Sequence, residues 1–155
     1  MPIKNFAEVI PDVLYRGSRP SPEDFKQQLA NMKSIINLEG DDVAAAEYQS
    51  AASLGMEWIW CPISISDIYA EGFPEPLCNY LLALMKWLPK PLFVHCQHGE
   101  DRTGLAVAMF RVEEQGWSPQ QAYQEALRYG YHPHFNAGLN KNFEKLGAKI
   151  SDWVI

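Results

Sequence analysis

The chain has 155 residues, a formal net charge of −6 and a sequence pI of about 5.2. This length suits one domain, and we expect a single domain over residues 1–155 with its core at about 10–146. Hydrophobic residues make up 47% of the chain, which is enough to build that core. The acidic balance, without Lys/Arg runs, argues against nucleic-acid and anionic-membrane partners.

The sequence also lacks the marks of export and of membrane insertion. No apolar stretch approaches the roughly 20 residues that span a bilayer, and the start at Met1–Asn5 carries no signal-peptide apolar region. Three cysteines form an odd count, which argues against a structural disulfide framework. We therefore expect a cytoplasmic protein, and we expect it to be a monomer.

The first half of the chain alternates strand-like and helix-like segments. Ser21, followed by Pro22 and two acidic residues, is a typical helix start. The pattern predicts strands over 13–16, 34–38 and 56–63 and helices over 21–32 and 41–54.

The second half continues the alternation. We expect a loop over 64–76, a central strand over 91–95, and helices over 77–88, 102–115, 118–129 and 136–149. Strands that alternate with helices predict an α/β fold with a central, mostly parallel sheet flanked by helices. The loop after the central strand then lies at the carboxyl edge of the sheet, where open sheets bind ligands.

That loop carries the strongest signal in the sequence. It reads HCQHGEDRTG from His95 to Gly104, with Cys96 and Arg102 at the two ends of a seven-residue turn. The start of the next helix offers unpaired N–H groups and a positive dipole end to an anion. A cysteine in that field should be a thiolate near neutral pH, and an arginine can hold two phosphate oxygens. Together they predict phosphoryl transfer to sulfur.

Five residue types at fixed spacing match the signature His-Cys-x-x-Gly-x-x-Arg-Ser/Thr: His95, Cys96, Gly99, Arg102 and Thr103. The chain therefore resembles the cysteine-dependent protein tyrosine phosphatases, and in particular their small dual-specificity branch. Residues 14–20 and 34–38 resemble the first strands of that branch. The resemblance implies a dual-specificity-phosphatase-like fold and a phosphocysteine intermediate, with no metal and no cofactor.

Each residue of the signature has an expected role. Cys96 should attack phosphorus, Thr103 should donate its hydroxyl to the sulfur, and His95 should orient the loop through the backbone. Backbone N–H groups should surround the phosphate oxygens, with Arg102 as the clamp. The expected phosphate-binding residues are Gln97, His98, Gly99, Glu100, Asp101 and Arg102.

The leaving oxygen also needs a proton. The resemblance implies an Asp on a loop upstream of the cysteine, and Asp67 in the predicted loop 64–76 has this placement, although no Trp-Pro-Asp triplet is present. An exposed loop Asp is ordinarily a turn or cap residue. Glu71 and Glu75 remain alternative acids.

The sequence alone does not identify the substrate. Glu100 and Asp101 weaken the case for an inositol pyrophosphate, and we expect Asp101 to orient backbone or Arg102 instead. Inositol phosphates remain candidates because basic residues elsewhere could add charge: Lys4, Arg16, Arg19, Lys26, His132 and His134. The histidines around Pro133 make a poor chelate, so we expect no metal.

The leading hypothesis is a cysteine-dependent phosphomonoester hydrolase of the dual-specificity or tyrosine phosphatase type. Its partner would be a phosphorylated protein or a small phosphorylated substrate such as an inositol phosphate. The alternatives are an inositol polyphosphate phosphatase with the same loop, a phosphate-binding pseudoenzyme, and a relative of arsenate reductases or rhodaneses. Cys61 and Cys78 are expected to be core thiols, and either could pair with Cys96 on oxidation.

Overall fold

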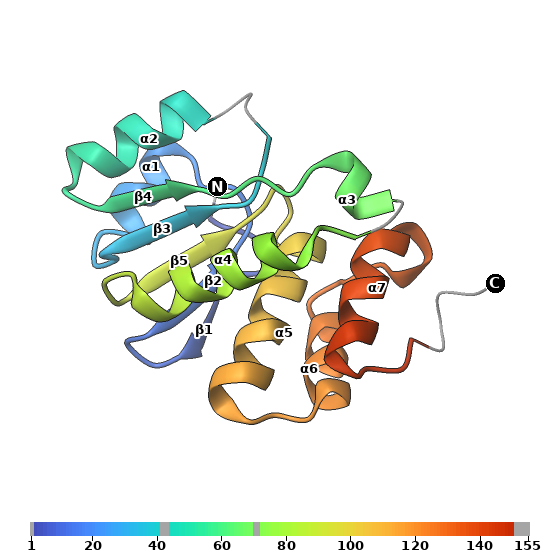
Figure 1. The fold of residues 1–155 in the computed structure, drawn as a ribbon. Helices are drawn as coiled ribbons and strands as arrows, with labels where there is room; N and C mark the ends of the chain where they lie inside the picture. Colours follow the sequence, from blue (N-terminus) through green and yellow to red (C-terminus); the bar gives the residue numbers. More distant parts are fainter. Residues whose placement is uncertain (1, 41–43, 70–71, 151–155) are drawn as a thin grey trace.

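The computed structural model describes residues 2–40, 44–69 and 72–150, and it is built around a five-stranded sheet of order β1-β2-β5-β3-β4 (Figure 1). The strands are β1 (Ala7–Ile10), β2 (Leu14–Gly17), β3 (Ser34–Asn37), β4 (Glu57–Trp60) and β5 (Leu92–His95). β1 pairs antiparallel with β2, and the other neighbours pair in parallel. This architecture confirms the α/β fold that the sequence predicted.

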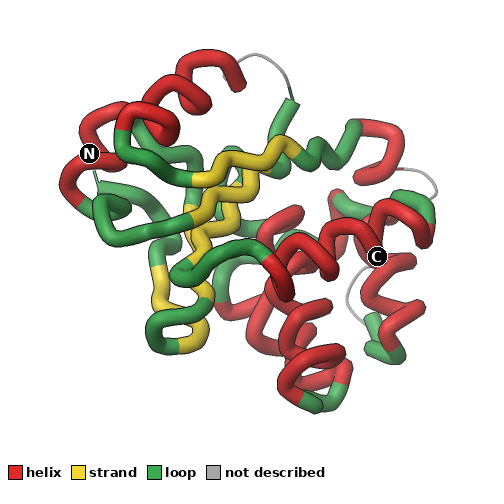
Figure 2. Tube along the Cα trace, turned by 60° about the vertical axis from the view of Figure 1, so that its left-hand side comes forward, coloured by secondary structure: helices red, strands yellow, loops and turns green. Residues whose placement is uncertain are grey.

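Helices cover both faces of the sheet, and Figure 2 shows the strands lying between them. α1 and α2 lie on one face, and α4 to α7 lie on the other (Figure 1). The helices are α1 (Pro22–Gln27), α2 (Ala44–Ser53), α3 (Ile65–Tyr69), α4 (Glu75–Trp87), α5 (Asp101–Gln115), α6 (Pro119–Arg128), the 3₁₀ helix η2 (Pro133–Phe135) and α7 (Ala137–Leu146). None of these helices is long and apolar enough to cross a membrane.

The two central strands are buried on both faces. Ile35 and Phe93 pack against α1 and α2, whereas Ile36 and Val94 pack into the larger core beneath α4 to α7. All four side chains are fully buried. Strands that are hydrophobic on both faces are typical of parallel sheets. They form a rigid platform whose carboxyl edge carries the loop after β5.

The structure corrects several of the predicted helix and strand boundaries. Loop 64–76 was predicted to be irregular throughout, but it contains the short helix α3, which begins after Ser64. β1 was not predicted, because its four partly exposed residues lie on an edge and carry little hydrophobic pattern. β4 ends at Trp60 instead of residue 63, and α1 ends at Gln27 instead of 32. The predicted helix 41–54 is present as α2, while residues 41–43 lie outside the described part.

Candidate active site

The segment between β5 and the start of α5, residues 96–102, forms a tight loop that we call the Cys96 loop. Cys96 is 3% exposed, and the buried Thr103 donates its hydroxyl to the Cys96 sulfur at 3.1 Å. α5 begins at Asp101, and its N-cap residue Glu100 makes no side-chain cap bond with any described residue. The first N–H groups of the helix are therefore available to an anion beside the thiol.

Gly99 gives the loop its shape. Its φ of +72° lies in the left-handed region, and a Cβ at this position would lie 2.5 Å from the carbonyl carbon of Gly17. A side chain at Gly99 would thus strain the backbone and collide with β2. The sequence signature required glycine here, and the structure supplies the physical reason.

The carbonyl groups of the Cys96 loop are held from outside. Three consecutive ones accept hydrogen bonds: Gln97 from the Arg19 N–H at 3.1 Å, His98 from the Asn5 amide at 2.9 Å, and Gly99 from the Arg16 guanidinium at 3.0 Å. With these carbonyls bound on the outside, the N–H groups of the same loop are left to face a bound anion. This arrangement is the one expected of a preorganised oxyanion cradle.

His95 lies fully buried directly before the loop. Its Nδ1 lies 3.1 Å from the Cys96 carbonyl oxygen, and its Nε2 lies 2.7 Å from Oε2 of Glu47 on α2. A carbonyl oxygen and a carboxylate oxygen both accept hydrogen bonds, so these two contacts on opposite sides of the ring fix the orientation of the imidazole. The expected backbone contact of His95 is therefore present. Its partner Glu47 was not found by sequence reasoning.

A second buried carboxylate, Glu39, completes this group. It lies 3.6 Å from Nδ1 of His95 and takes a two-nitrogen hydrogen bond from Arg19, with a closest distance of 2.6 Å. Trp58 also donates its indole N–H to Glu47 at 2.8 Å. The cluster of two carboxylates and a histidine has the residue types of a metal site. Both oxygens of Glu39 and Oε2 of Glu47 already accept from protein donors, while Oε1 of Glu47 has no partner among the described residues. Because three of the four oxygens are engaged in this way, we assign the cluster to positioning His95.

Arg102, the expected clamp, projects from the first turn of α5. Its Nη1 donates to the Leu38 carbonyl oxygen at 3.4 Å, and the residue is partly exposed. Leu38 directly follows β3, so the guanidinium reaches across the carboxyl edge of the neighbouring strand. A long bond to a single carbonyl leaves most of the donors of Arg102 free to bind oxygens.

Asp101 ties the Cys96 loop to a distant segment. Its Oδ1 accepts from the backbone N–H of His132 at 2.8 Å and lies 3.1 Å from Nδ1 of the same residue. The expected role in orienting backbone is thus seen, although the backbone belongs to His132. The segment from His132 to η2 is held in turn by Asn136 and Asn140, which donate to the carbonyls of His132 and Pro133.

Asp67 lies in the first turn of α3. Its Oδ2 accepts from the N–H and the hydroxyl of Ser64 at 2.8 and 2.7 Å, which is a capping interaction. Its carbonyl oxygen packs so closely on Gly138 of α7 that a Cβ there would lie 1.9 Å away. Since α7 follows the His132 segment, α3 is linked through it to Asp101 and the Cys96 loop.

The alternative acids differ in position. Glu75 opens α4 and borders a hollow of about 390 Å³ between α4, α5 and α7, together with Cys78 and Lys145. None of the residues that line this hollow belongs to the Cys96 loop. Glu71 lies outside the described residues.

A smaller hollow of about 330 Å³ adjoins the Cys96 loop. Gln97 and His98 form one wall, and the cationic side chains of Lys4 and Arg19 lie around it. Arg16, which was expected to add charge from another loop, is instead buried behind the Cys96 loop.

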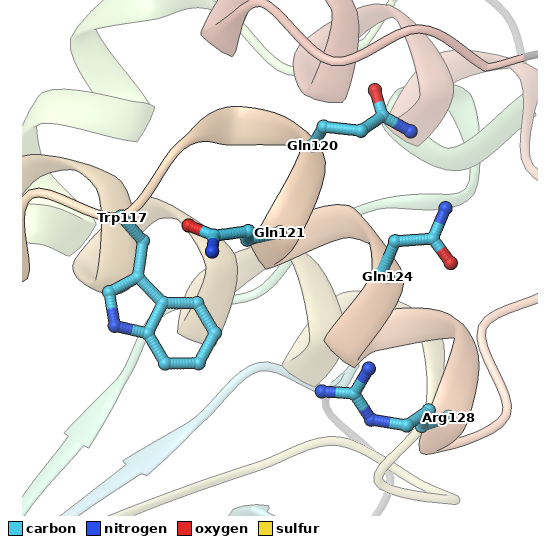
Figure 3. Close-up of a pocket in the computed structure, with 5 residues that line it drawn as sticks. All are labelled: Trp117, Gln120, Gln121, Gln124 and Arg128. Atoms are coloured by element: carbon cyan, nitrogen blue, oxygen red, sulfur yellow. The ribbon is translucent and has the colours of Figure 1, made fainter.

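A larger hollow of about 570 Å³ lies along α6, lined by Trp117, Arg128 and three glutamines (Figure 3). These side chains include no thiol, carboxylate or imidazole. The size of a hollow therefore does not identify the reactive site, and the chemistry points to the Cys96 loop.

The geometry is that of an α/β protein with a buried cysteine, a tight loop and an arginine between a central strand and a helix. A family model described as a tyrosine phosphatase family matches residues 1–145. The chain belongs to this family.

Curated relatives match the chain over different extents. A tyrosine-protein phosphatase-like protein of Saccharomyces cerevisiae, OCA2, is 34% identical over 131 residues, which cover 81% of this chain and 65% of OCA2. The dual specificity protein phosphatase TpbA of Pseudomonas aeruginosa is 49% identical over 41 residues, 26% of this chain and 19% of TpbA. The chain thus spans less than two thirds of either relative.

Solved structures share the fold. The core catalytic domain of the S. cerevisiae PP-IP phosphatase SIW14, in complex with citrate, superposes with a TM-score of 0.75 at 23% identity, covering 99% of this chain and 90% of that one. P. aeruginosa TpbA gives a TM-score of 0.74 at 22% identity, covering 92% of this chain and 84% of that one.

Proposed function

We propose that this protein is a metal-independent, cysteine-dependent phosphomonoester hydrolase. The observation that carries the proposal is the 3.1 Å hydrogen bond from Thr103 to the Cys96 sulfur, inside a loop whose carbonyls are held from outside. This bond stabilises negative charge on sulfur, which the nucleophile needs before attack and regains when it leaves.

The reaction has two steps. The Cys96 sulfur attacks phosphorus, an S–P bond forms, and the P–O bond to the leaving group breaks as that oxygen takes a proton from Asp67. The Asp67 carboxylate then accepts a proton from water, the water oxygen bonds to phosphorus, and the S–P bond breaks. Arg102 and the loop N–H groups hold the equatorial oxygens throughout, and Thr103 stabilises the departing thiolate.

Asp67 can take this role through its Oδ1, because the N–H and hydroxyl of Ser64 both bind Oδ2. The support for Asp67 is the link from α3 through α7 and His132 to the Cys96 loop. Glu75 has no such link among the described contacts, and the hollow that it borders lies between α4, α5 and α7.

The substrate class follows from the surroundings of the Cys96 loop. A phosphorylated protein is the first candidate, since TpbA is named a dual specificity protein phosphatase and one of its structures holds pTyr. An inositol phosphate is the second, favoured by the hollow that Lys4 and Arg19 border beside the loop. SIW14, named an inositol diphosphatase, is 25% identical over 84% of this chain.

One panel separates these candidates. Phosphotyrosine and phosphoserine peptides, inositol polyphosphates, thiosulfate and arsenate are offered to wild type and to Cys96→Ser. We expect phosphate release from at least one phosphate ester and none from Cys96→Ser, because a hydroxyl is a poor nucleophile here. Turnover of Cys96→Ser within threefold of wild type would reject the covalent mechanism. Turnover of thiosulfate or arsenate alone would favour the other enzyme classes.

We also infer a single phosphatase domain over 1–155 that acts as a monomer in the cytoplasm. A free nucleophilic thiol needs a reducing compartment, and all three cysteines are free thiols. Light scattering at micromolar concentration measures the mass, and a dimer would contradict the monomer.

A further inference from the structure

Arg16 is a buried arginine that lies behind the Cys96 loop. It is 1% exposed, sits on β2 opposite Val94, and donates from Nη2 to the Gly99 carbonyl oxygen at 3.0 Å. The ring of Tyr129 covers the guanidinium, with 4.1 Å from Cζ to the ring centroid. The atoms Nε and Nη1 have no hydrogen-bond partner among the described residues.

A buried cation with two nitrogens that have no hydrogen-bond partner among the described residues is costly to keep. Burial lowers the pKa of Arg16 to about 10, so the guanidinium is still charged at neutral pH. One hydrogen bond to a carbonyl and one ring contact offset only part of this cost. An anionic group held in the same interior would offset more of this cost.

Four ionisable groups near Arg16 act on its pKa: Glu125, Tyr129 and Cys96 raise the pKa, and Arg111 lowers it. Glu125 is already engaged, since both its oxygens accept from Arg111 at 3.1 and 2.8 Å. Tyr129 presents its ring. Cys96 begins the loop whose Gly99 carbonyl oxygen accepts from Arg16, so the thiolate is the further anion that the Arg16 charge can stabilise.

We propose that Arg16 is a positioning residue that balances the charge of the Cys96 thiolate from behind the loop and fixes the Gly99 carbonyl away from the bound phosphate. The inference rests on the proposed function, because it takes Cys96 as the nucleophile. A residue of β2, outside the sequence signature, would then help to stabilise the negative charge on the Cys96 sulfur.

The rate of alkylation of Cys96 by iodoacetamide measures the effect of Arg16 on the thiolate. The reagent is neutral, so its rate follows the thiolate fraction without the help of an anion site. Burial raises the pKa of both Cys61 and Cys78 to about 11, so neither reacts appreciably near neutral pH. Peptide mapping of the modified chain assigns the reactive thiol.

The informative variant is Arg16→Gln, which keeps an amide donor for Gly99 but removes the charge. We expect the midpoint of its alkylation profile to rise by about one pH unit, and its rate at pH 6 to fall about tenfold. Arg128→Gln is the matched control, because it removes an exposed charge next to Tyr129 on α6 (Figure 3). Its midpoint should stay within about 0.2 units of wild type. A shift below about 0.3 units in Arg16→Gln would overturn the proposal.

Two further measurements separate this role from a purely structural one. Arg16→Gln should unfold in urea close to the wild-type midpoint, because the cost of burying the guanidinium and its interaction with the thiolate are lost together. A lower midpoint with an unchanged alkylation profile would make Arg16 structural. If Arg16→Gln does not fold, Arg16→Lys is measured instead. An alkylation profile like that of the wild type supports the charge role, and a midpoint shifted by a full pH unit rejects it. If the thiol that reacts at pH 6 persists in Cys96→Ser, the proposed function fails instead.

Discussion

The Cys96 loop and the segment that carries Asp67 differ in how the rest of the chain holds them. The loop is fixed by buried groups from other elements: Thr103 on the sulfur, Glu47 behind His95, and Arg16 on Gly99. The Asp67 carboxylate is held by Ser64, three residues away, and is partly exposed. Charge stabilisation needs fixed dipoles, whereas a proton donor must exchange its proton with water. The Cys96 loop and the Asp67 segment thus have the properties that their proposed roles require.

Arg102→Lys tests the Cys96 loop, and it should give the largest loss of activity among these variants. A point charge cannot replace a planar two-nitrogen fork, so we expect kcat/KM to fall on the order of 10²-fold or more, ~2.7 kcal/mol. Steady-state kinetics on para-nitrophenyl phosphate measures the loss. The exposed Arg128→Lys is the control and should change nothing. A loss below fivefold in Arg102→Lys would show that this residue is not the clamp.

Asp67→Asn tests the proposed proton donor. We expect kcat to fall about 10- to 100-fold on an alkyl phosphate and less than about threefold on an activated aryl phosphate, whose leaving oxygen needs no proton. The alkaline limb of kcat/KM should also flatten, because the group that must stay protonated has gone. The same pair of substrates is measured with Glu75→Gln and Glu71→Gln. Equal loss on both substrates in Asp67→Asn, or leaving-group dependence in a Glu variant, contradicts the assignment.

Gly138→Ala tests how α3 is positioned. The new Cβ would meet the Asp67 carbonyl oxygen at 1.9 Å, so α3 must move. We expect about a tenfold loss of kcat on the alkyl phosphate and little on the aryl phosphate, because misplacing an acid impairs proton transfer. Gly40→Ala is the control, since a Cβ there meets nothing within 4 Å. In the Asp67→Asn background the Gly138→Ala loss should vanish, and full additivity would count against the link.

Glu47→Gln gives the smallest expected change in rate. It removes the carboxylate that faces His95 and Trp58 while keeping the size of the side chain. We expect the free energy of unfolding to fall by about 1–3 kcal/mol and kcat/KM to fall about threefold. Urea denaturation and steady-state kinetics measure the two, with the exposed Glu57→Gln as control. Unchanged stability would show that Glu47 does not fix His95.

The difference between local and long-range contacts explains which parts of the site could be predicted from the sequence. The signature of the Cys96 loop occupies nine consecutive positions, His95 to Thr103, between a strand and a helix that each have their own pattern. Local chemistry was therefore enough to propose Cys96, Arg102 and Thr103 as site residues. The sheet was predictable too, because β3 and β5 are short apolar runs between helical segments.

The supporting residues were missed because they lie far along the chain. Glu47 is 48 residues from His95, and Arg16 is 83 residues from Gly99. Each left a weak signal, namely a charged residue where the core was expected. Arg16 shares its strand face with the buried Leu14, and Glu47 lies in an alanine-rich helix. The contact of Asp67 with Gly138 left none, because it depends on backbone packing between α3 and α7.

The most direct test of the account is to trap the covalent intermediate. Wild-type protein is mixed with a ³²P-labelled aryl phosphate, quenched with denaturant within the first turnover, and digested for peptide mapping. If Cys96 is the nucleophile, the label lies on the peptide that contains Cys96, through an S–P bond, and Cys96→Ser carries no label. Turnover with the label on another residue, or with no labelled protein at any quench time, would contradict it.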